Sequence, residues 1–316
     1  MLRYTLRRLA WLPLILFAVS IIAFVMLRAL PGQDPAAAMA GQGATPEQVE
    51  RIRQDLNLDR PIAEQYIEWV KDAVVLDFGE EFRSDKPIVD EFMRRFPASF
   101  QIITMALFFS ALFGITFGIL SAMFRNTGLD YGVRTFAVAG SSIPDFFLLS
   151  LLIIVPSILW HYSMPVGGYR PLWEDPSHNL RLMLPPALIL GVGGSAGLMR
   201  LTRTTMLEVL RSDYVRTAHA KGLRQRTVIV THALRNAGTP IATALGTALI
   251  AVFGGSVIVE RILSIQGVGE WFFTAAFIRD LPVVQFLTVY TACVVVLVNL
   301  AVDLSYAYID PRIRYT

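Results

Sequence analysis

The chain has 316 residues, of which 54% are hydrophobic and only 17% are charged. Because an average soluble domain is about 25% charged, this composition indicates a membrane protein. The net charge of +3 is too small to imply a nucleic-acid partner, and the lone Cys293 excludes an internal disulfide and a cysteine metal site.

The first apolar run, Leu9 to Leu30, follows Arg3, Arg7 and Arg8 and is long enough to cross about 30 Å of hydrocarbon. It resembles a signal peptide but lacks a small-residue cleavage site, so we expect a retained anchor. A Pro-Gly pair at residues 31–32 should end this span. The arginines before it and the acidic segment after it predict a cytoplasmic N-terminus.

Residues 31–98 form a polar insert that we expect on the far side of the membrane. Thr45-Pro-Glu-Gln48 is a capping box with proline at the first helical position, so a helix should begin there. Residues 61–75 predict an amphipathic helix too short and charged to span, and residues 87–96 predict a third short helix. We interpret the insert as a small cap on the membrane bundle; contact with a soluble partner is the alternative.

The second span is predicted from Phe100 to Phe124, and it carries small residues at every fourth position. The positions are Ser110, Gly114, Gly118 and Ala122. Such a stripe allows another helix to approach closely, which is a packing feature rather than a chemical site.

The third span is predicted from about Val133 to Trp160, interrupted by Pro144 and Pro156. Asp145 follows the first proline, and a carboxylate within the membrane costs about 2.5–3.5 kcal/mol on insertion scales. One interpretation is that Asp145 lines a translocation path and meets a positive charge on a substrate. The other is that it bonds backbone groups freed by Pro144.

Three further spans are predicted at about residues 182–204, 238–259 and 283–309, which gives six in total. The two histidines of the outside loop, residues 161–181, lack a ligand at a tight spacing, so we predict no metal site. Asp303 in the last span is a second candidate for an inward-facing carboxylate on the translocation path. Both termini are expected in the cytoplasm.

The segment from Arg200 to Asn236 lies between the fourth and fifth spans and is strongly basic, which predicts a cytoplasmic loop. Helical spacing and the absence of proline over Asp213 to Leu223 predict a short helix there. Gly222 supplies the positive φ with which helices commonly end. The alternative is that these charges only fix the topology.

No phosphate-binding Gly-rich loop, nucleophile-elbow Gly-x-Ser-x-Gly or His-Glu-x-x-His motif occurs in the chain. Ionisable residues within the spans are few, whereas a proton-coupled carrier normally carries several. These absences predict a passive membrane pathway that takes its energy from other chains.

The loop sequence Asp213-Tyr-Val-Arg-Thr-Ala-His-Ala-Lys-Gly222-Leu, followed by His232-Ala-Leu-Arg-Asn236 and Pro240, resembles the cytoplasmic coupling loop of ABC-importer permeases. The opening Leu-Arg-Tyr-Thr-Leu-Arg-Arg, the Leu-Pro-Gly-x-Asp-Pro at residues 30–35, and the closing Asp310-Pro-Arg extend this likeness. Together they resemble the dipeptide/oligopeptide/nickel ABC-transporter permease family. Departures are Thr217 in place of a glutamate, Asp145, the extra Gln33, and Gln266 in place of a proline.

The resemblance implies an all-α polytopic protein of the bacterial inner membrane with a type I ABC-importer permease fold. It implies an N-terminal part at 1–98, with one span and the insert, and a five-helix core at 99–316 that contains the coupling loop, 200–236. The implied partners are a homologous sister permease, two ABC ATPase subunits, an extracytoplasmic substrate-binding protein and membrane lipid. ATP and Mg²⁺ would be bound by the ATPases, so this chain would hold no cofactor.

The resemblance also implies which residues meet the ATPase. They are Asp213, Tyr214, Arg216, Thr217, Ala218, Ala220, Lys221, Gly222 and Leu223. Small residues would fit a groove on the ATPase, and the two basic ones would meet polar groups. The expected cargo is di- or oligopeptide, with a nickel complex, glutathione or another small solute as alternatives. From other classes, an ATP-independent channel or a secondary transporter remains possible, although neither needs a coupling loop of this sequence.

Overall fold

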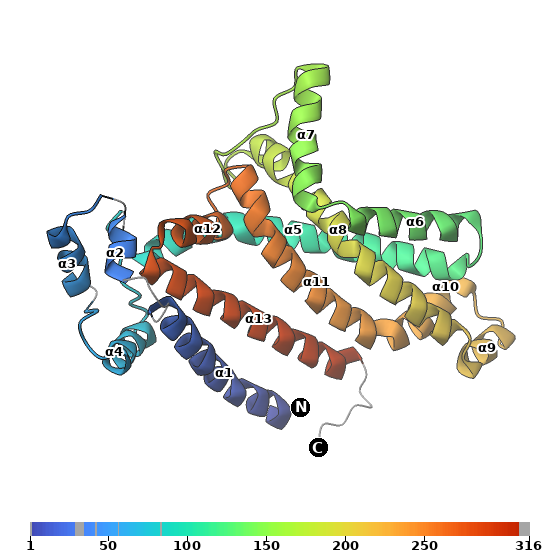
Figure 1. The fold of residues 1–316 in the computed structure, drawn as a ribbon. Coiled ribbons are helices and arrows are strands. Elements are labelled where there is room, and N and C mark those ends of the chain that lie inside the picture. Colours follow the sequence, from blue (N-terminus) through green and yellow to red (C-terminus); the bar gives the residue numbers. More distant parts are fainter. Residues whose placement is uncertain (1, 29–34, 42, 56, 83, 310–316) are drawn as a thin grey trace. The chain divides into compact units, whose positions relative to one another are not determined.

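The computed structural model describes residues 2–28, 35–41, 43–55, 57–82 and 84–309. The described segments are almost entirely helical (Figure 1). The helices are α1 (Leu2–Arg28), α2 (Pro35–Ala40), α3 (Pro46–Asp55), α4 (Ile62–Val74), α5 (Ile88–Met123), α6 (Gly128–Ser142), α7 (Asp145–Trp160), α8 (Pro176–Leu210), α9 (Asp213–Ala220), α10 (Gln225–Thr227), the π-helical turn η1 (Val228–Ala233), α11 (Leu234–Ile262), α12 (Val268–Ile278) and α13 (Leu281–Ile309).

Some sequence features lie outside the described residues. They are the Pro-Gly pair expected to end the first span, Gln33 and Asp34, the closing Asp310-Pro-Arg, and the side chains of Arg3, Arg7 and Arg8. The expected sidedness of the two termini therefore stays a prediction.

Within the described residues, five helices are long and apolar enough to cross a membrane, and a sixth span exists if α6 and α7 are counted as one. The five are Leu9–Met26, Ile88–Met123, Pro176–Leu210, Gln225–Ile262 and Leu281–Tyr306. The third span is interrupted at Pro144, as predicted, and α6 and α7 meet there at 89°. The second predicted interruption does not occur, because α7 runs through Pro156. The residue before a proline is driven out of the helical region, and Ile143 adopts φ −98° and ψ 122° ahead of Pro144.

Helix α5 corrects the expectation of a separate short helix over residues 87–96. It runs through Pro97 without a break from Ile88 to Met123. A proline removes one backbone hydrogen bond but does not stop a helix whose flanking turns are packed. The short segment therefore extends the second span.

The chain packs as two compact units. Of the described residues, the first unit holds 98–266 with 2–5 and 297–309, and the second holds those of 6–97 and 267–296. The stretch 267–296 thus packs with the N-terminal segment, whereas the division at residue 98 predicted from the sequence assigns it to the core. That predicted domain division stays a prediction.

In the first unit, α8 packs against α5, α6 and α11, and glycines set the distances. A Cβ atom built on Gly114 would lie 2.7 Å from Leu198 Cγ, and one on Gly118 would lie 2.6 Å from Thr202 Cβ. A Cβ atom on Gly191 of α8 would lie 2.5 Å from the Cβ of Phe109. The small-residue stripe of α5 is therefore the surface on which α8 lies, as predicted.

In the second unit, the capping box forms as predicted. The Thr45 backbone N–H donates to Gln48 Oε1 at 2.9 Å, and the Gln48 N–H donates to Thr45 Oγ1 at 3.3 Å. Tyr66 of α4 packs edge-on against Phe24 of α1, with ring centroids 5.3 Å apart, and its hydroxyl bonds Ser20 at 2.8 Å. The amphipathic face predicted for residues 61–75 thus lies on the first span.

Candidate functional site

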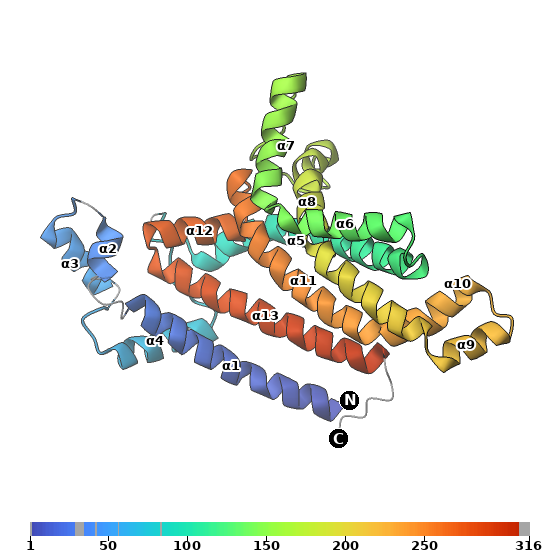
Figure 2. The same cartoon turned by 45° about the vertical axis from the view of Figure 1, so that its right-hand side comes forward.

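The predicted coupling segment lies where α8 ends and α11 begins, at one end of this helix pair in both views (Figures 1 and 2). Helix α9 covers Asp213–Ala220 and ends in a Schellman motif. The Leu223 N–H donates to Ala218 O at 3.3 Å, and the Gly222 N–H donates to His219 O at 2.9 Å. Gly222 has φ +77°, so glycine holds the turn that the sequence predicted.

One face of α9 is packed inside the chain. Val215 is 1% exposed and Ala218 is 8% exposed, and both contact the fully buried Val228. Val209 and Leu210 at the end of α8 complete this cluster. The short helix is thereby held against the end of α8 and against η1, the turn that leads into α11. Ala218 points into the protein, which separates it from the other coupling residues.

The hydroxyl group of Tyr214 is held by Asn236 of α11. Asn236 Nδ2 donates to the Tyr214 hydroxyl at 2.9 Å and to the backbone oxygen of His232 at 2.8 Å. The carbonyl of His232 lies in the π-helical turn η1, a type of insertion often found at functional sites. The stretch from His232 to Asn236, noted in the sequence for its resemblance, thus holds Tyr214 in place.

The outer face of α9 and its following turn is open to solvent. The side chains of Asp213 and Arg216 are 96% and 75% exposed and form an i,i+3 pair at 3.4 Å. The other exposed members of the predicted set are Tyr214, Thr217, Ala220, Lys221, Gly222 and Leu223. An exposed pair of this kind contributes little stability, so these charges are available to another molecule.

A buried ion pair, which the sequence reasoning missed, anchors α8 near the start of the predicted coupling loop, 200–236. Asp130 of α6 is 0% exposed and accepts from Arg203 Nε at 2.8 Å and Nη2 at 2.9 Å. The Ser121 hydroxyl and the Asn126 backbone N–H donate to the same carboxylate. Arg203 lies in the basic segment 200–236, which the sequence analysis treated as a loop. The one sequence signal for its partner is that Asp130 is acidic while the neighbouring Arg125 and Arg134 are basic.

Asp145, one of the two candidate pathway residues, lies beside a cavity of about 280 Å³ formed by α6, α7, α8 and α11. Its Oδ1 would be 2.5 Å from a Cβ atom placed on Gly193, so the carboxylate touches the glycine-rich stretch of α8. Among the described residues, the structure gives this carboxylate neither a hydrogen-bond donor nor a cation.

Asp303, the second candidate, is half-buried on α13 and does not line this cavity as far as the described residues define it. The structure therefore places Asp145, but not Asp303, at this cavity. In the loop of residues 161–181, the Nε2 atom of His178 lies 2.9 Å from the backbone oxygen of Gly168. Within the described segments, no group of three or more potential metal ligands occurs.

Two family models match the chain. The model of the binding-protein-dependent transport system inner membrane component covers residues 114–315. The model of the N-terminal part of such membrane components covers residues 1–104.

Curated relatives match over nearly the full length. A putative peptide transport system permease protein of Brucella abortus (strain 2308) is 37% identical over 310 residues, 98% of each chain. The dipeptide transport system permease protein DppB of Escherichia coli (strain K12) is 34% identical and covers 100% of this chain and 99% of its own. A probable peptide ABC transporter permease of Sinorhizobium fredii (strain NBRC 101917 / NGR234) is 35% identical over 312 residues.

The fold also has a solved counterpart. A chain of the MetNI methionine ABC transporter, in an inward-facing conformation, superposes with a TM-score of 0.55 at 18% identity. The match covers 68% of this chain and 95% of that one. At this identity the likeness concerns the fold alone.

Proposed function

Because the chain belongs to the family of binding-protein-dependent transport system inner membrane components, we propose that it forms half of the translocation pathway of a bacterial ABC importer for di- and oligopeptides. The peptide cargo is supported by the relatives in Brucella and Escherichia coli, which are named as peptide and dipeptide transport permeases. The proposed assembly contains a homologous sister permease, two ABC ATPases and an extracytoplasmic binding protein, placed in the bacterial inner membrane. ATP and Mg²⁺ are bound, and ATP is hydrolysed, on the ATPase chains.

The observation that carries the proposal is the two-sided construction of α9. Its inner face, Val215 and Ala218, fixes the helix to the end of α8 and to η1, which runs directly into α11. Its outer face offers the small residues Ala220 and Gly222 beside the exposed Arg216 and Lys221. A helix held on one side by packed side chains moves with the elements it packs on. A partner that grips the outer face can therefore pull α8 and α11.

The proposed cycle is alternating access. ATP binding closes the ATPase dimer, α9 follows, and the membrane helices open outward; hydrolysis resets them. The Asp130–Arg203 pair supports this proposal, because it links α8 to α6 close to the point where α9 begins. A movement of α9 would then be transmitted to both helices. On the pathway itself, we assign Asp145 the role of meeting a positive charge on the passing substrate, since it borders a cavity formed by four helices. Asp303 is a second, less supported candidate.

The test is co-purification of the tagged chain with its native neighbours in mild detergent, followed by mass spectrometry of the eluate. The wild-type chain should recover a sister permease and Walker-type ATPases. Gly222→Asp should lose the ATPases, because it places an uncompensated carboxylate on the gripped surface. Gly222→Asn is the matched control. Asparagine has nearly the same shape as aspartate but no charge, and it tolerates φ > 0, so this variant should still recover the ATPases.

Two results would contradict the proposal. Normal ATPase recovery and peptide uptake by Gly222→Asp would remove the coupling role from α9. A stable chain that elutes alone or as a homo-oligomer would favour an ATP-independent channel or a secondary transporter. A second variant pair gives an independent reading: Ala220→Arg on the outer face should weaken the complex, whereas Thr227→Arg on exposed α10 should not.

A further inference from the structure

The turn between α5 and α6 carries more positive charge than its single acid can neutralise. Arg125 and Arg134 are both exposed, whereas Asp130 is the one acidic residue between Phe124 and Ser142. The turn lies at the same end of the first unit as α9 in both views (Figures 1 and 2). The proposed transport cycle assigns no role to these two arginines.

The carboxylate of Asp130 is already neutralised inside the protein. It is 0% exposed and accepts four hydrogen bonds, two of them from Arg203 at 2.8 and 2.9 Å. The Nε atom of Arg134 lies 3.7 Å from the same carboxylate, which is too far for a hydrogen bond. Within the part of the chain that the structure describes, Arg125 forms no ion pair and Arg134 forms no hydrogen bond. Two guanidinium charges are therefore available to another molecule.

Exposed apolar side chains share this turn with the arginines. Phe124 directly follows the apolar span of α5, and Phe124, Leu129 and Tyr131 are all exposed. The guanidinium of Arg134 lies 4.6 Å from the centre of the Tyr131 ring, so these two side chains form one patch. Aromatic and basic side chains at the end of a span are typical of the membrane–water interface, where an arginine stem lies along apolar surface. The turn is therefore expected at the level of the lipid headgroups.

The charges of the turn select among lipid headgroups. A guanidinium binds a phosphate group through two parallel hydrogen bonds. A zwitterionic headgroup also brings an ammonium group, but the one carboxylate of the turn, Asp130, is buried and already accepts four hydrogen bonds. An anionic headgroup brings no such unpaired cation and is attracted by both arginines. A soluble anion has the same charge but leaves Phe124 and Leu129 exposed to water.

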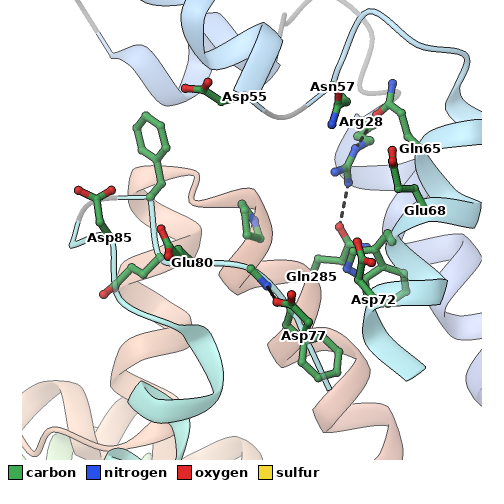
Figure 3. A pocket seen from close by; sticks show the side chains of 16 residues that line it. Arg28, Asp55, Asn57, Gln65, Glu68, Asp72, Asp77, Glu80, Asp85 and Gln285 are labelled. Atoms are coloured by element: carbon green, nitrogen blue, oxygen red, sulfur yellow. Dashed lines mark hydrogen bonds between the residues drawn. The ribbon is translucent and has the colours of Figure 1, made fainter. Parts of the chain in front are cut away.

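A second charged surface has the opposite sign. In the second unit, seven carboxylates line a cavity of about 620 Å³ (Figure 3). They are Asp55, Glu68, Asp72, Asp77, Glu80, Glu81 and Asp85. Among the described residues that line it, Arg28 is the only cation, and its Nη1 and Nε atoms donate to the amide oxygens of Gln285 and Gln65. An anionic headgroup is repelled from such a surface, so selective binding of an anionic lipid should depend on the first unit.

We propose that the α5–α6 turn binds an anionic phospholipid whose phosphate group bonds Arg125 and Arg134. The acyl chains of this lipid contact Phe124 and Leu129. The bound lipid holds the turn, and with it the start of α6, at the membrane surface. This inference goes beyond the proposed function, because it requires neither a peptide nor an ATPase.

The test is native mass spectrometry of the full-length chain in mild detergent, titrated with phosphatidylglycerol or with phosphatidylcholine. The two lipids carry the same acyl chains, so a difference in affinity reports the headgroup alone. The wild-type chain should bind phosphatidylglycerol about tenfold or more tightly, because each basic residue near an anionic lipid contributes about fivefold in affinity.

Single variants locate the site. Arg125→Gln and Arg134→Gln should each weaken the binding of phosphatidylglycerol about fivefold and should weaken that of phosphatidylcholine less. The matched control is Arg181→Gln, which removes an exposed arginine near the start of α8, whereas Arg203 lies near its end. This control should keep the wild-type affinity. Thermal unfolding of each variant checks that it is folded.

Equal affinities of the wild-type chain for the two lipids would overturn the proposal, and this comparison needs no variant to fold. An equal loss in Arg181→Gln and Arg134→Gln would overturn the assigned position. Displacement of phosphatidylglycerol by inorganic phosphate, at an ionic strength matched with chloride, would also overturn it, because the site would then hold a soluble anion. Recovery of the ATPases by co-purification is a separate readout, so either proposal can fail without the other.

Discussion

Replacing Asp130 by asparagine should destabilise the first unit more than any other single charge removal near the coupling segment. The carboxylate is 0% exposed and receives four hydrogen bonds, from Ser121, the Asn126 backbone and both Arg203 nitrogens Nε and Nη2. Breaking one side of a buried pair costs about 3–5 kcal/mol, because the other charge is left uncompensated. Arg203 is 19% exposed, so water softens the loss and the lower end, about 3 kcal/mol, is expected.

The assay is equilibrium unfolding of the purified chain in detergent, with a double-mutant cycle. Asp130→Asn and Arg203→Gln should each be strongly destabilising, and the double variant should cost much less than their sum. Arg134→Gln is the matched control, because Arg134 lies 3.7 Å from Asp130 with its side chain 44% exposed, and should change stability by less than about 1 kcal/mol. If the Asp130→Asn variant had the same unfolding free energy as the wild-type chain, the reasoning would be refuted.

Three further predictions concern single residues: Gly118, Asp280 and Asp145. Gly118→Ala should destabilise by about 1–3 kcal/mol, because its Cβ would lie 2.6 Å from Thr202, whereas Gly132→Ala, with nothing within 4 Å, should be tolerated in the same unfolding assay. Burial raises the pKa of Asp280 from 3.8 to about 6, so folding favours its protonated form; stability should fall as pH rises from about 4 to 6, and Asp280→Asn should abolish that slope, which unfolding measured across this range will check. Asp145→Asn should reduce uptake of lysine-containing peptides more than uptake of neutral ones in the reconstituted importer; equal uptake would remove its proposed role.

Local signals in the sequence led to correct structure where one or two residues determine the geometry. The reciprocal bonds of Thr45 and Gln48 follow from residue type and spacing alone. Gly222 takes the positive φ that a Schellman motif requires. The stripe that includes Gly114 and Gly118 packs on α8, since only small residues permit that distance.

Features that depend on distant partners were not predictable in the same way. The sequence predicted a separate short helix over residues 87–96, but α5 continues from there through Pro97 into the second span. The bend after Ser142 could be located at Pro144, but its angle of 89° is set by what α6 and α7 pack against. Asp130 pairs with Arg203, 73 positions away, and Arg28 with Gln285, 257 positions away. A single sequence carries no signal for such pairings.

The central claim is that the outer face of α9 is the surface gripped by the ATPase. It is tested most directly by placing a photo-crosslinking amino acid at Leu223, which is 40% exposed on that face. The control position is Tyr131, which is 55% exposed at the start of α6. The account predicts a covalent product between the Leu223 position and an ATPase subunit, and none from the Tyr131 position. ATP-driven uptake by the assembled importer without any crosslink from the Leu223 position would contradict it.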